Sequence, residues 1–315
     1  MTRIAVDAMG GDHAPAAIVD GAAAAAVHFG IPISLVGPSA VVEQALDRHT
    51  GWRDAGITIV DAADVIDMAE PSAAVRRKPR ASIRVAADLV ACHEAGALFS
   101  AGHTGATVMA AHAAFGMLAG VERPALAATI PTRQRPAVLL DAGANVECRP
   151  QHLLQFAVMG SVFAHVALGV ERPRVGLLSI GEEESKGNEL TREAHRLLKD
   201  GPINFIGNVE GRDIYSGDTD VVVCDGFTGN VVLKTSEGLV ELLTSHSVLH
   251  PPQSVDYADY GGAPLLGVAG LAIVGHGRSS ARAVANAIAM AHRFASERFI
   301  HRVEQEIAAA TVPHH

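Results

Sequence analysis

Glycines and small polar residues gather at six places in the chain, each between an apolar run and a helical pattern. These loops span residues 7–13, 100–105, 141–145, 179–188, 225–230 and 275–280. Glycine lets main-chain N–H groups approach a ligand closely, and helix N-termini favour anions. In an open α/β sheet, ligands bind beyond the carboxyl ends of the strands. The pattern therefore predicts a phosphate-binding site, although turn glycines alone would explain any single loop.

The residues that we expect to hold phosphate or the adjoining substrate lie in the first three of these loops. Their main-chain N–H, hydroxyl, imidazole and carboxamide groups can donate hydrogen bonds to anionic oxygens. They are Asp7, Gly10, Gly11, Asp12, His13, Ser100, Gly102, Thr104, Gly105 and Asn145.

Three further side chains are candidates for catalysis. Lys186 follows three acidic residues at a predicted helix start, where it can hold phosphate or stabilise an oxyanion, or be a solvated loop lysine. Asn230 stands at another predicted helix start, where it can donate to a carbonyl oxygen or cap the helix. His103 lies within the glycine loop 100–105.

Sequence patterns for other chemistries are missing. The chain has no GxxxxGK[ST] nucleotide loop, no HExxH zinc motif and no GxSxG nucleophile elbow. Its three cysteines, Cys92, Cys148 and Cys224, form no CxxC pair, which favours a reduced protein, and Cys148 and Cys224 are interpreted as packing residues. We therefore expect neither a metal nor a cofactor.

The charge balance argues against a nucleic-acid ligand. The 315 residues carry a formal net charge of −9, whereas nucleic-acid-binding domains usually present a basic stripe. Basic residues concentrate at Arg76, Arg77 and Lys78. This cluster indicates either a docking patch for an acidic partner or a solvated face.

Short apolar runs alternate with helical patterns and predict an α/β protein with a mostly parallel sheet. Buried strands are predicted at 4–6, 33–36, 57–60, 97–99, 137–140, 175–178, 221–224 and 271–274. Helices are predicted at 16–29, 82–93, 104–118, 151–168, 189–199 and 280–309.

We find no linker or repeat and expect residues 1–315 to form a single bilobed unit. Residues 245–262 contain a Pro-Pro pair, which cannot lie inside a helix, and are predicted to be a surface excursion. No signal-peptide pattern is present, and no apolar run reaches the roughly 18–20 residues needed to span a bilayer. The expected location is cytoplasmic, with at most peripheral contact at the inner face of the membrane.

Long blocks of the sequence resemble the PlsX family, the acyl-acyl carrier protein:phosphate acyltransferases. They include IAVDAMGGDHAP at 4–15, SAGHTGA at 100–106, DAGANV at 141–146, GLLSIGEEESKGNELT at 176–191, NFIGNVEGRD at 204–213, DGFTGNVVLK at 225–234, YGGAPLLG at 260–267 and GHG at 275–277. The blocks are distributed over nearly the whole chain.

The resemblance implies a three-layer α/β/α sandwich like those of isopropylmalate dehydrogenase and phosphotransacetylase, in a homodimer. It implies transfer of a fatty-acyl group from acyl carrier protein to inorganic phosphate, giving an acyl phosphate for a membrane-bound glycerol-3-phosphate acyltransferase in phospholipid synthesis. Phosphate is the nucleophile, so the enzyme must supply positioning and oxyanion stabilisation. We expect Lys186 and Asn230 to stabilise the oxyanion, with His103 nearby.

Two positions depart from the family pattern. His103 stands where the family usually has Asn, and the stretch between Leu243 and Tyr257 is shorter than the usual amphipathic hairpin, which is associated with membrane and carrier-protein contact. Two other functions stay open: a phosphotransacetylase-like enzyme that uses short acyl-CoA, and a non-catalytic scaffold for lipid-synthesis enzymes. A nicotinamide dehydrogenase is disfavoured, because the glycines at 275 and 277 lack the third glycine of a dinucleotide-binding motif.

Overall fold

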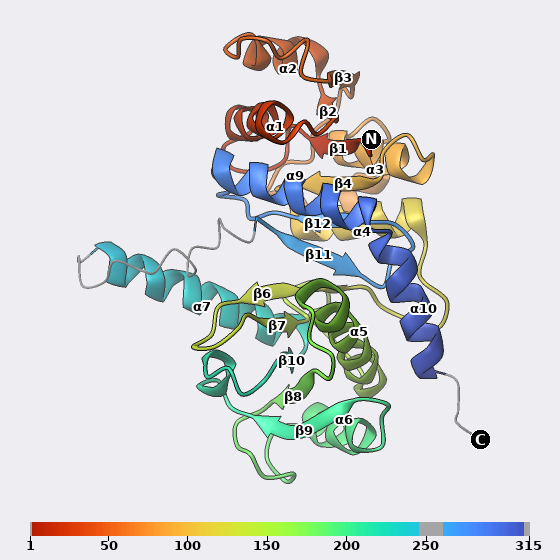
Figure 1. Cartoon of the computed structure of the whole chain (residues 1–315), viewed down its shortest axis with the longest axis vertical. Coiled ribbons are helices and arrows are strands. Elements are labelled where there is room, and N and C mark those ends of the chain that lie inside the picture. Colours follow the sequence, from red (N-terminus) through yellow and green to blue (C-terminus); the bar gives the residue numbers. More distant parts are fainter. Residues whose placement is uncertain (1, 246–260, 312–315) are drawn as a thin grey trace. The chain divides into compact units, whose positions relative to one another are not determined.

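The computed structural model describes residues 2–245 and 261–311, which fall into two compact units (Figure 1). Unit 1 comprises Met1–Met117 and Asp256–Ile300, and unit 2 comprises Leu118–Val255 and His301–His315. The surface excursion predicted at 245–262 lies, except for its two ends, outside the described residues.

Unit 1 contains a largely parallel sheet with the strand order β3-β2-β1-β4-β12-β11. Only β11 runs antiparallel to its neighbour β12 among these strands. Strands β1, β2 and β4 consist of buried residues throughout, as expected for parallel strands covered on both faces. The bounds are β1 (Ile4–Asp7), β2 (Ile33–Gly37), β3 (Ile57–Asp61), β4 (Ala97–Ser100), β11 (Ala263–Leu266) and β12 (Ala272–Val274).

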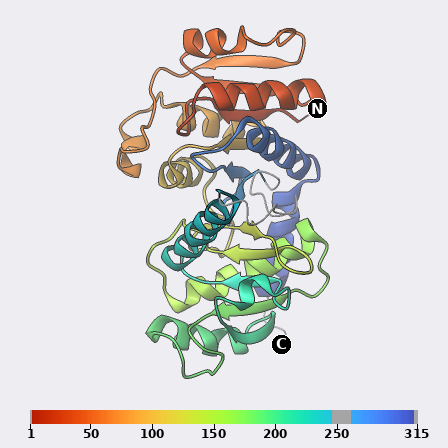
Figure 2. The same ribbon diagram turned by 90° about the vertical axis from the view of Figure 1, so that its left-hand side faces the viewer.

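Helices cover both faces of this sheet (Figure 2). On one face α3 packs against α4, and on the other α1 packs against α9. The short helix α2 contacts β2 and β3, and the 3-10 helix η1 packs against α4. The bounds are α1 (Ala16–Phe29), α2 (Ser39–Leu46), η1 (Ser72–Arg76), α3 (Ser82–Ala91), α4 (Thr104–Phe115) and α9 (Ala281–Ser296).

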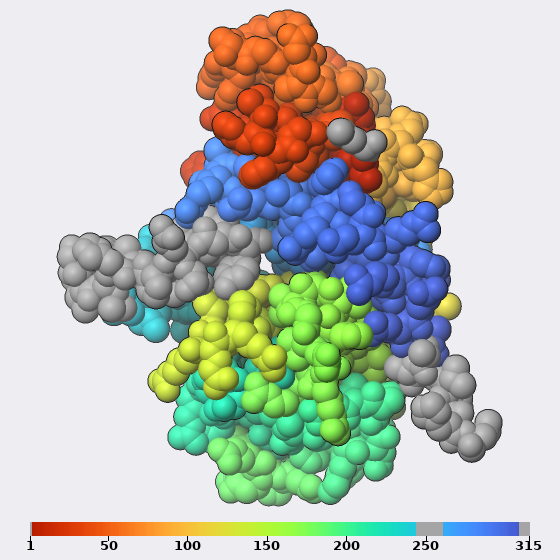
Figure 3. All heavy atoms as spheres, viewed as in Figure 1, coloured from red at the N-terminus to blue at the C-terminus, as the bar shows by residue number. Residues whose placement is uncertain are grey.

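The contact between α1 and α9 depends on small residues. A Cβ atom at Gly21 would lie 2.5 Å from both the carbonyl oxygen of Ala281 and the Cβ of Val284. The two helices lie side by side in the space-filling view, where α1 is red and α9 is blue (Figure 3). The alanine-rich sequence of both helices therefore serves close helix packing.

Unit 2 contains a second sheet with the order β6-β7-β10-β8-β9, in which only β6 is antiparallel to its neighbour. Helices α5 and α6 pack together on one side, and α7 contacts β7 from the other (Figure 1). The bounds are β5 (Ala125–Leu126), β6 (Ala128–Ile130), β7 (Ala137–Leu140), α5 (Pro150–Leu168), β8 (Arg174–Leu178), α6 (Glu189–Lys199), β9 (Asn204–Val209), η2 (Asp213–Tyr215), β10 (Val221–Val223) and α7 (Gly226–Ser245).

The α/β class is confirmed, and each predicted strand is present. The single helix predicted at 280–309 is wrong. The chain forms α9 and then α10 (Phe299–Thr311), with Arg298 between them at a φ of 53°. The apolar stripe continues across this break because Phe294 and Phe299 stack at 4.6 Å between ring centroids, so periodicity alone did not reveal it.

Helix α5 is long and apolar enough to cross a membrane by length and composition, although polar residues interrupt its apolar runs in the sequence. More than half of its most apolar window is buried, against β7, β8, β10 and α6. Its side chains Phe156 and Phe163 are at most 2 % exposed. These contacts make α5 a core helix of unit 2.

Candidate active site

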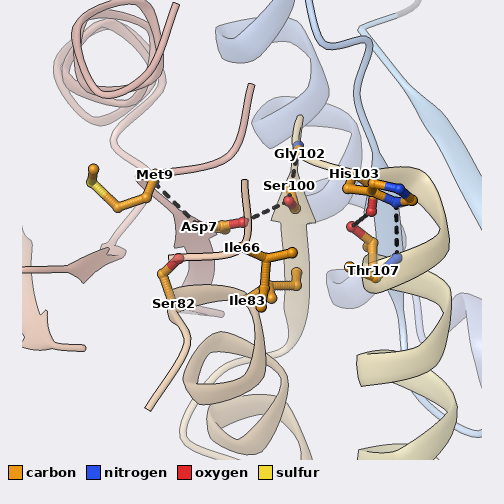
Figure 4. Close-up of a pocket in the computed structure, with 10 residues that line it drawn as sticks. Asp7, Met9, Ile66, Ser82, Ile83, Ser100, Gly102, His103 and Thr107 are labelled. Atoms are coloured by element: carbon orange, nitrogen blue, oxygen red, sulfur yellow. Dashed lines mark hydrogen bonds between the residues drawn. The ribbon is translucent and has the colours of Figure 1, made fainter. Parts of the chain in front are cut away.

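A small pocket in unit 1 lies where β1 and β4 end and α3 and α4 begin (Figure 4). It contains four of the residues predicted from the glycine loops, together with apolar side chains. The lining residues are Asp7, Met9, Ile66, Ser82, Ile83, Ser100, Gly102, His103, Ala106 and Thr107.

Hydrogen bonds within this pocket join the loop after β1 to the loop after β4. Ser100 Oγ donates to Asp7 Oδ2 at 2.8 Å and accepts from the N–H of Gly102 at 3.1 Å, while the N–H of Met9 donates to Asp7 Oδ1 at 3.2 Å. Burial raises the pKa of Asp7, against the hydrogen bonds from Ser82, Ser100 and Met9. Asp7 and Ser100 therefore position the loops, since their polar atoms already have partners.

His103 begins α4 and caps it. Its Nδ1 accepts from the N–H of Ala106 at 3.3 Å, so the neutral ring carries its proton on Nε2 and can donate from there. The N–H groups of Thr104 and Gly105 occupy the first turn of α4, where a helix offers no internal acceptor. The start of α4 thus presents main-chain donors and an imidazole donor to an anion.

The remaining predicted unit 1 residues lie in the loop 10–13, which packs against the loop 275–277. The N–H of Asp12 donates to the carbonyl oxygen of Gly277 at 2.8 Å. Gly11 has a φ of 113°, and a Cβ there would lie 3.1 Å from the same oxygen. His13 is exposed. We predicted no site residue in the loop 275–280. The Gly-His-Gly pattern at 275–277 was the sequence signal that could have assigned this loop to the site.

Lys186 belongs to unit 2, in the loop between β8 and α6, and its side chain is exposed. A Cβ at Gly181 would lie 2.9 Å from Lys186 Cγ, so glycine leaves room for the lysine stem. Two of the three acids that precede it pair elsewhere: Glu184 lies 2.9 Å from Lys199, and Glu182 lies 3.6 Å from Arg212. Within residues 2–245 and 261–311, no ion pair neutralises Lys186.

Asn230 lies in the first turns of α7 and is exposed, but it does not cap the helix. Asp225 does so, because its Oδ1 accepts from the N–H of Thr228 at 2.9 Å and its Oδ2 from the Thr228 hydroxyl at 2.7 Å. The Asn230 carboxamide lies against Gly143, where a Cβ would be 2.9 Å from Asn230 Nδ2. The capping role predicted as one possibility for Asn230 is therefore taken by Asp225.

Asn145 is buried and its side chain is committed within unit 2. Its Nδ2 donates to the carbonyl oxygen of Pro124 at 2.6 Å and to Asp141 Oδ2 at 2.8 Å. Both amide hydrogens are thus used, so the geometry does not support the expected contact between this side chain and phosphate. Asn145 instead helps to hold the loop that lies beside Asn230.

The sequence profile of the family described as "Fatty acid synthesis protein" matches residues 2–247 and 242–302. The chain belongs to this family. The resemblance to the PlsX family is thereby confirmed.

Relatives with a named activity extend over nearly all of the chain. A phosphate acyltransferase of Syntrophotalea carbinolica is 50 % identical over 95 % of this chain and 92 % of the relative. A phosphate acyltransferase of Geotalea uraniireducens is 47 % identical over 97 % of this chain and 94 % of the relative.

Solved structures confirm the fold class. A phosphotransacetylase from Streptococcus pyogenes superposes with a TM-score of 0.63 at 18 % identity, over 98 % of this chain and 94 % of the other. EutD phosphotransacetylase from Staphylococcus aureus gives 0.62 at 16 % identity, over 93 % and 94 %. The family member described here is therefore a phosphotransacetylase-like α/β/α protein, as expected.

Two of the three cysteines, Cys148 and Cys224, lie in surroundings that disfavour the thiolate. Burial raises the pKa of Cys148 to about 12, with the nearby Asp141 charge adding to the rise. Burial also raises the pKa of Cys224. Thiolates are therefore scarce near neutral pH at both positions, which agrees with their interpretation as packing residues. Among the described residues, no group of three His, Cys, Asp or Glu side chains is placed to hold a metal ion.

The predicted basic patch is only partly available. Arg76 and Arg77 are exposed. Lys78, in contrast, lies 2.7 Å from Glu70 and donates to the carbonyl oxygen of Val65 at 2.8 Å. The positive charge that this patch offers to an acidic protein therefore comes mainly from the two arginines.

Proposed function

We propose that this protein transfers a fatty-acyl group from acyl carrier protein to inorganic phosphate, which yields an acyl phosphate and the free carrier thiol. The observation that carries the proposal is the near-full-length identity of 47–50 % to proteins named phosphate acyltransferase. That name assigns acyl transfer to phosphate. The carrier protein as acyl donor is our own inference from the resemblance.

The proposed phosphate site is the start of α4. Main-chain N–H groups of Thr104 and Gly105, with His103 Nε2, donate to the phosphate oxygens. Gly102 and Gly10 let the loops after β4 and β1 pack closely here, because a Cβ at Gly10 would lie 2.7 Å from both Asp7 Oδ2 and the Gly102 nitrogen. A helix N-terminus of this kind binds anions without any nucleotide motif.

The reaction that we propose needs no protein nucleophile. A phosphate oxygen attacks the thioester carbonyl carbon, and the carbonyl electron pair moves onto oxygen. When the tetrahedral intermediate collapses, the C–S bond breaks and the carrier sulfur leaves as a thiolate that takes a proton from water. We assign stabilisation of the oxyanion to the Lys186 ammonium and the Asn230 amide.

The deciding experiment measures phosphate-dependent release of free carrier thiol from a long-chain acyl carrier protein, with acyl phosphate as the co-product. Parallel reactions use acyl-CoA of short and long chain. Turnover that requires phosphate and prefers the carrier thioester is the expected result. Preference for short acyl-CoA would indicate a phosphotransacetylase-like enzyme instead, and no turnover with any thioester would leave the scaffold function.

We expect Gly10→Ala to weaken orthophosphate binding by at least about 10-fold, because the new methyl group forces the two loops apart and displacements near 1 Å are costly at such sites. Isothermal titration with phosphate measures the effect. Gly211→Ala is the control, since no described atom lies within 4 Å of a Cβ at that position. Equal affinities for the two variants would contradict the placement of phosphate at the start of α4.

We also propose that the enzyme is a homodimer in the cytoplasm that passes acyl phosphate to a membrane-bound glycerol-3-phosphate acyltransferase. The chemistry of the acyl phosphate supports its transfer to that enzyme. An acyl phosphate is a reactive mixed anhydride, and the lipid made from it belongs in the membrane. Exposed Arg76 and Arg77 are our candidates for contact with the acidic carrier protein. Light scattering of the purified protein tests the dimer.

A further inference from the structure

A chain of hydrogen bonds in unit 2 connects α6 and β9 to the loop that carries Lys186. His195 Nδ1 on α6 lies 2.9 Å from Asn208 Oδ1 on β9. Asn208 Nδ2 donates to the carbonyl oxygen of Glu183 at 2.9 Å. The N–H of Lys186 donates to that same oxygen at 3.0 Å. The Glu183 carbonyl oxygen therefore accepts two hydrogen bonds, one from the Asn208 side chain and one from the Lys186 main chain.

A bulge in β9 determines which way Asn208 faces. The pairing of β9 with β8 shifts by one residue between Val175 and Gly176, because β9 contains one extra residue, Ile206. Gly207, at a φ of 99°, takes a backbone conformation that other residues rarely adopt. An extra residue reverses the faces of the side chains that follow it. Asn208 is thereby buried and turned toward α6, while Ile206 is exposed.

The donors and acceptors in this chain can be assigned from the geometry. A carbonyl oxygen cannot donate, so the Asn208 amide group faces Glu183 and its oxygen faces the imidazole. His195 Nδ1 therefore carries a proton and donates it to Asn208. On the other side of the ring, Nε2 lies 3.5 Å from Glu184, which is itself 2.9 Å from Lys199.

Both side chains of this pair are almost fully removed from solvent, with Asn208 7 % and His195 5 % exposed. The imidazole also meets the ring of Phe205 edge-on, at 5.1 Å between centroids. Burying two polar side chains is unfavourable unless their hydrogen bonds are made. The hydrogen bond from Asn208 Nδ2 ends on the Glu183 carbonyl oxygen, in the loop that carries Lys186. The buried pair is therefore placed to hold that loop.

We propose that Asn208, oriented by His195, is a positioning residue that fixes the backbone of the 181–188 loop and so the origin of the Lys186 side chain. This rests on the proposed function, in which Lys186 stabilises the oxyanion. Lys186 is exposed and none of the described residues forms an ion pair with it, so its backbone anchor decides where the ammonium group can reach. Asn208 itself contacts no reacting atom.

Asn208→Asp provides the sharpest test. The carboxylate keeps the size of the side chain and can still accept from His195, but it can no longer donate to the Glu183 carbonyl oxygen. We expect kcat for phosphate-dependent thiol release to fall about 10- to 100-fold, as for other displacements near 1 Å at active sites. KM for phosphate and for the acyl carrier protein should stay within about twofold, since the phosphate donors lie elsewhere in the chain.

Two further variants separate positioning from general stability. Lys199→Gln breaks the exposed pair with Glu184 beside the same ring and leaves the Glu183 carbonyl contact intact, so its kcat should match wild type. His195→Asn retains an N–H donor near the position of Nδ1, whereas His195→Phe retains an aromatic ring but has no donor for Asn208. We expect His195→Asn to be the more active of these two, with thermal melting reporting any loss of folding.

A double-mutant cycle with Lys186→Ala shows whether Asn208 acts through the lysine. Asn208→Asp should cause no further loss in the Lys186→Ala background. A wild-type kcat for Asn208→Asp, or the same loss in both backgrounds, overturns the proposal. Failure of the proposed function looks different, because wild type would then release no thiol. Hydrogen exchange at the Lys186 amide, expected to accelerate in Asn208→Asp, still tests the structural link in that case.

Discussion

Replacing Lys186 by alanine is expected to lower kcat for phosphate-dependent thiol release by about 10²–10³-fold, the usual effect of losing one oxyanion donor. The lysine is exposed, and of the three acids that precede it Glu184 pairs with Lys199 and Glu182 with Arg212, while none of the described residues forms an ion pair with Lys186 itself. Its charge is therefore available to a developing oxyanion. Steady-state kinetics with a long-chain acyl carrier protein measure the change.

The control for this prediction is Lys199→Gln, which removes another exposed lysine of unit 2 from outside the proposed site. It should leave kcat unchanged. Lys186→Arg should recover only part of the activity, because a planar guanidinium does not replace a compact ammonium group. A Lys186→Ala enzyme within about threefold of wild type would remove the lysine from the mechanism.

The largest effect on stability is expected for Asp141→Ala. The Asp141 carboxylate accepts from the N–H groups of Leu126, Gly143, Ala144 and Asn145 and from the Asn145 side chain, at 2.7–3.1 Å. Burial raises the pKa of Asp141, and these donors offset part of that rise. Each buried donor left without a partner costs about 1–3 kcal/mol, so we expect a loss of at least about 4 kcal/mol.

Urea and thermal unfolding measure this loss. Asp141→Asn keeps one acceptor oxygen for the loop 143–145 and should be clearly less destabilised than Asp141→Ala. Asp200→Ala, at an exposed position of unit 2, should change the unfolding free energy by less than about 0.5 kcal/mol. Similar stability of Asp141→Ala and wild type would show that solvent or rearranged groups satisfy the five donors.

The sequence placed the polar residues of the candidate site in loops at strand ends, but it did not show which of them bond to one another. Sequence patterns located the loops at the ends of β1 and β4 because glycine and small polar residues follow short apolar runs. They could not show that Asp7 and Ser100, 93 residues apart, bond to each other. A residue whose polar atoms are already paired positions its loop, whereas one with a spare donor can contact a ligand.

The same limit explains the roles of Asn230 and Asn208. Both a capping and a donating role were compatible with the sequence around Asn230, until Asp225 was found in the capping position. Asn208 gave no signal of its own, because its orientation depends on the bulge at Gly207 and its partner His195 lies on a different element. A local sequence pattern reveals neither the bulge nor the contact with His195.

The sequence alone determined the α/β class, the identity of the family and the positions of the most apolar strands, but not those of β5, β6, β9 and β11. Apolar runs and long motif blocks are properties of neighbouring residues, which is why these features could be predicted. Only the tertiary structure decided where α9 ends, which loops pack together and which polar atoms are already paired. Those outcomes depend on contacts between residues far apart in the chain, and such contacts arise only when the elements pack.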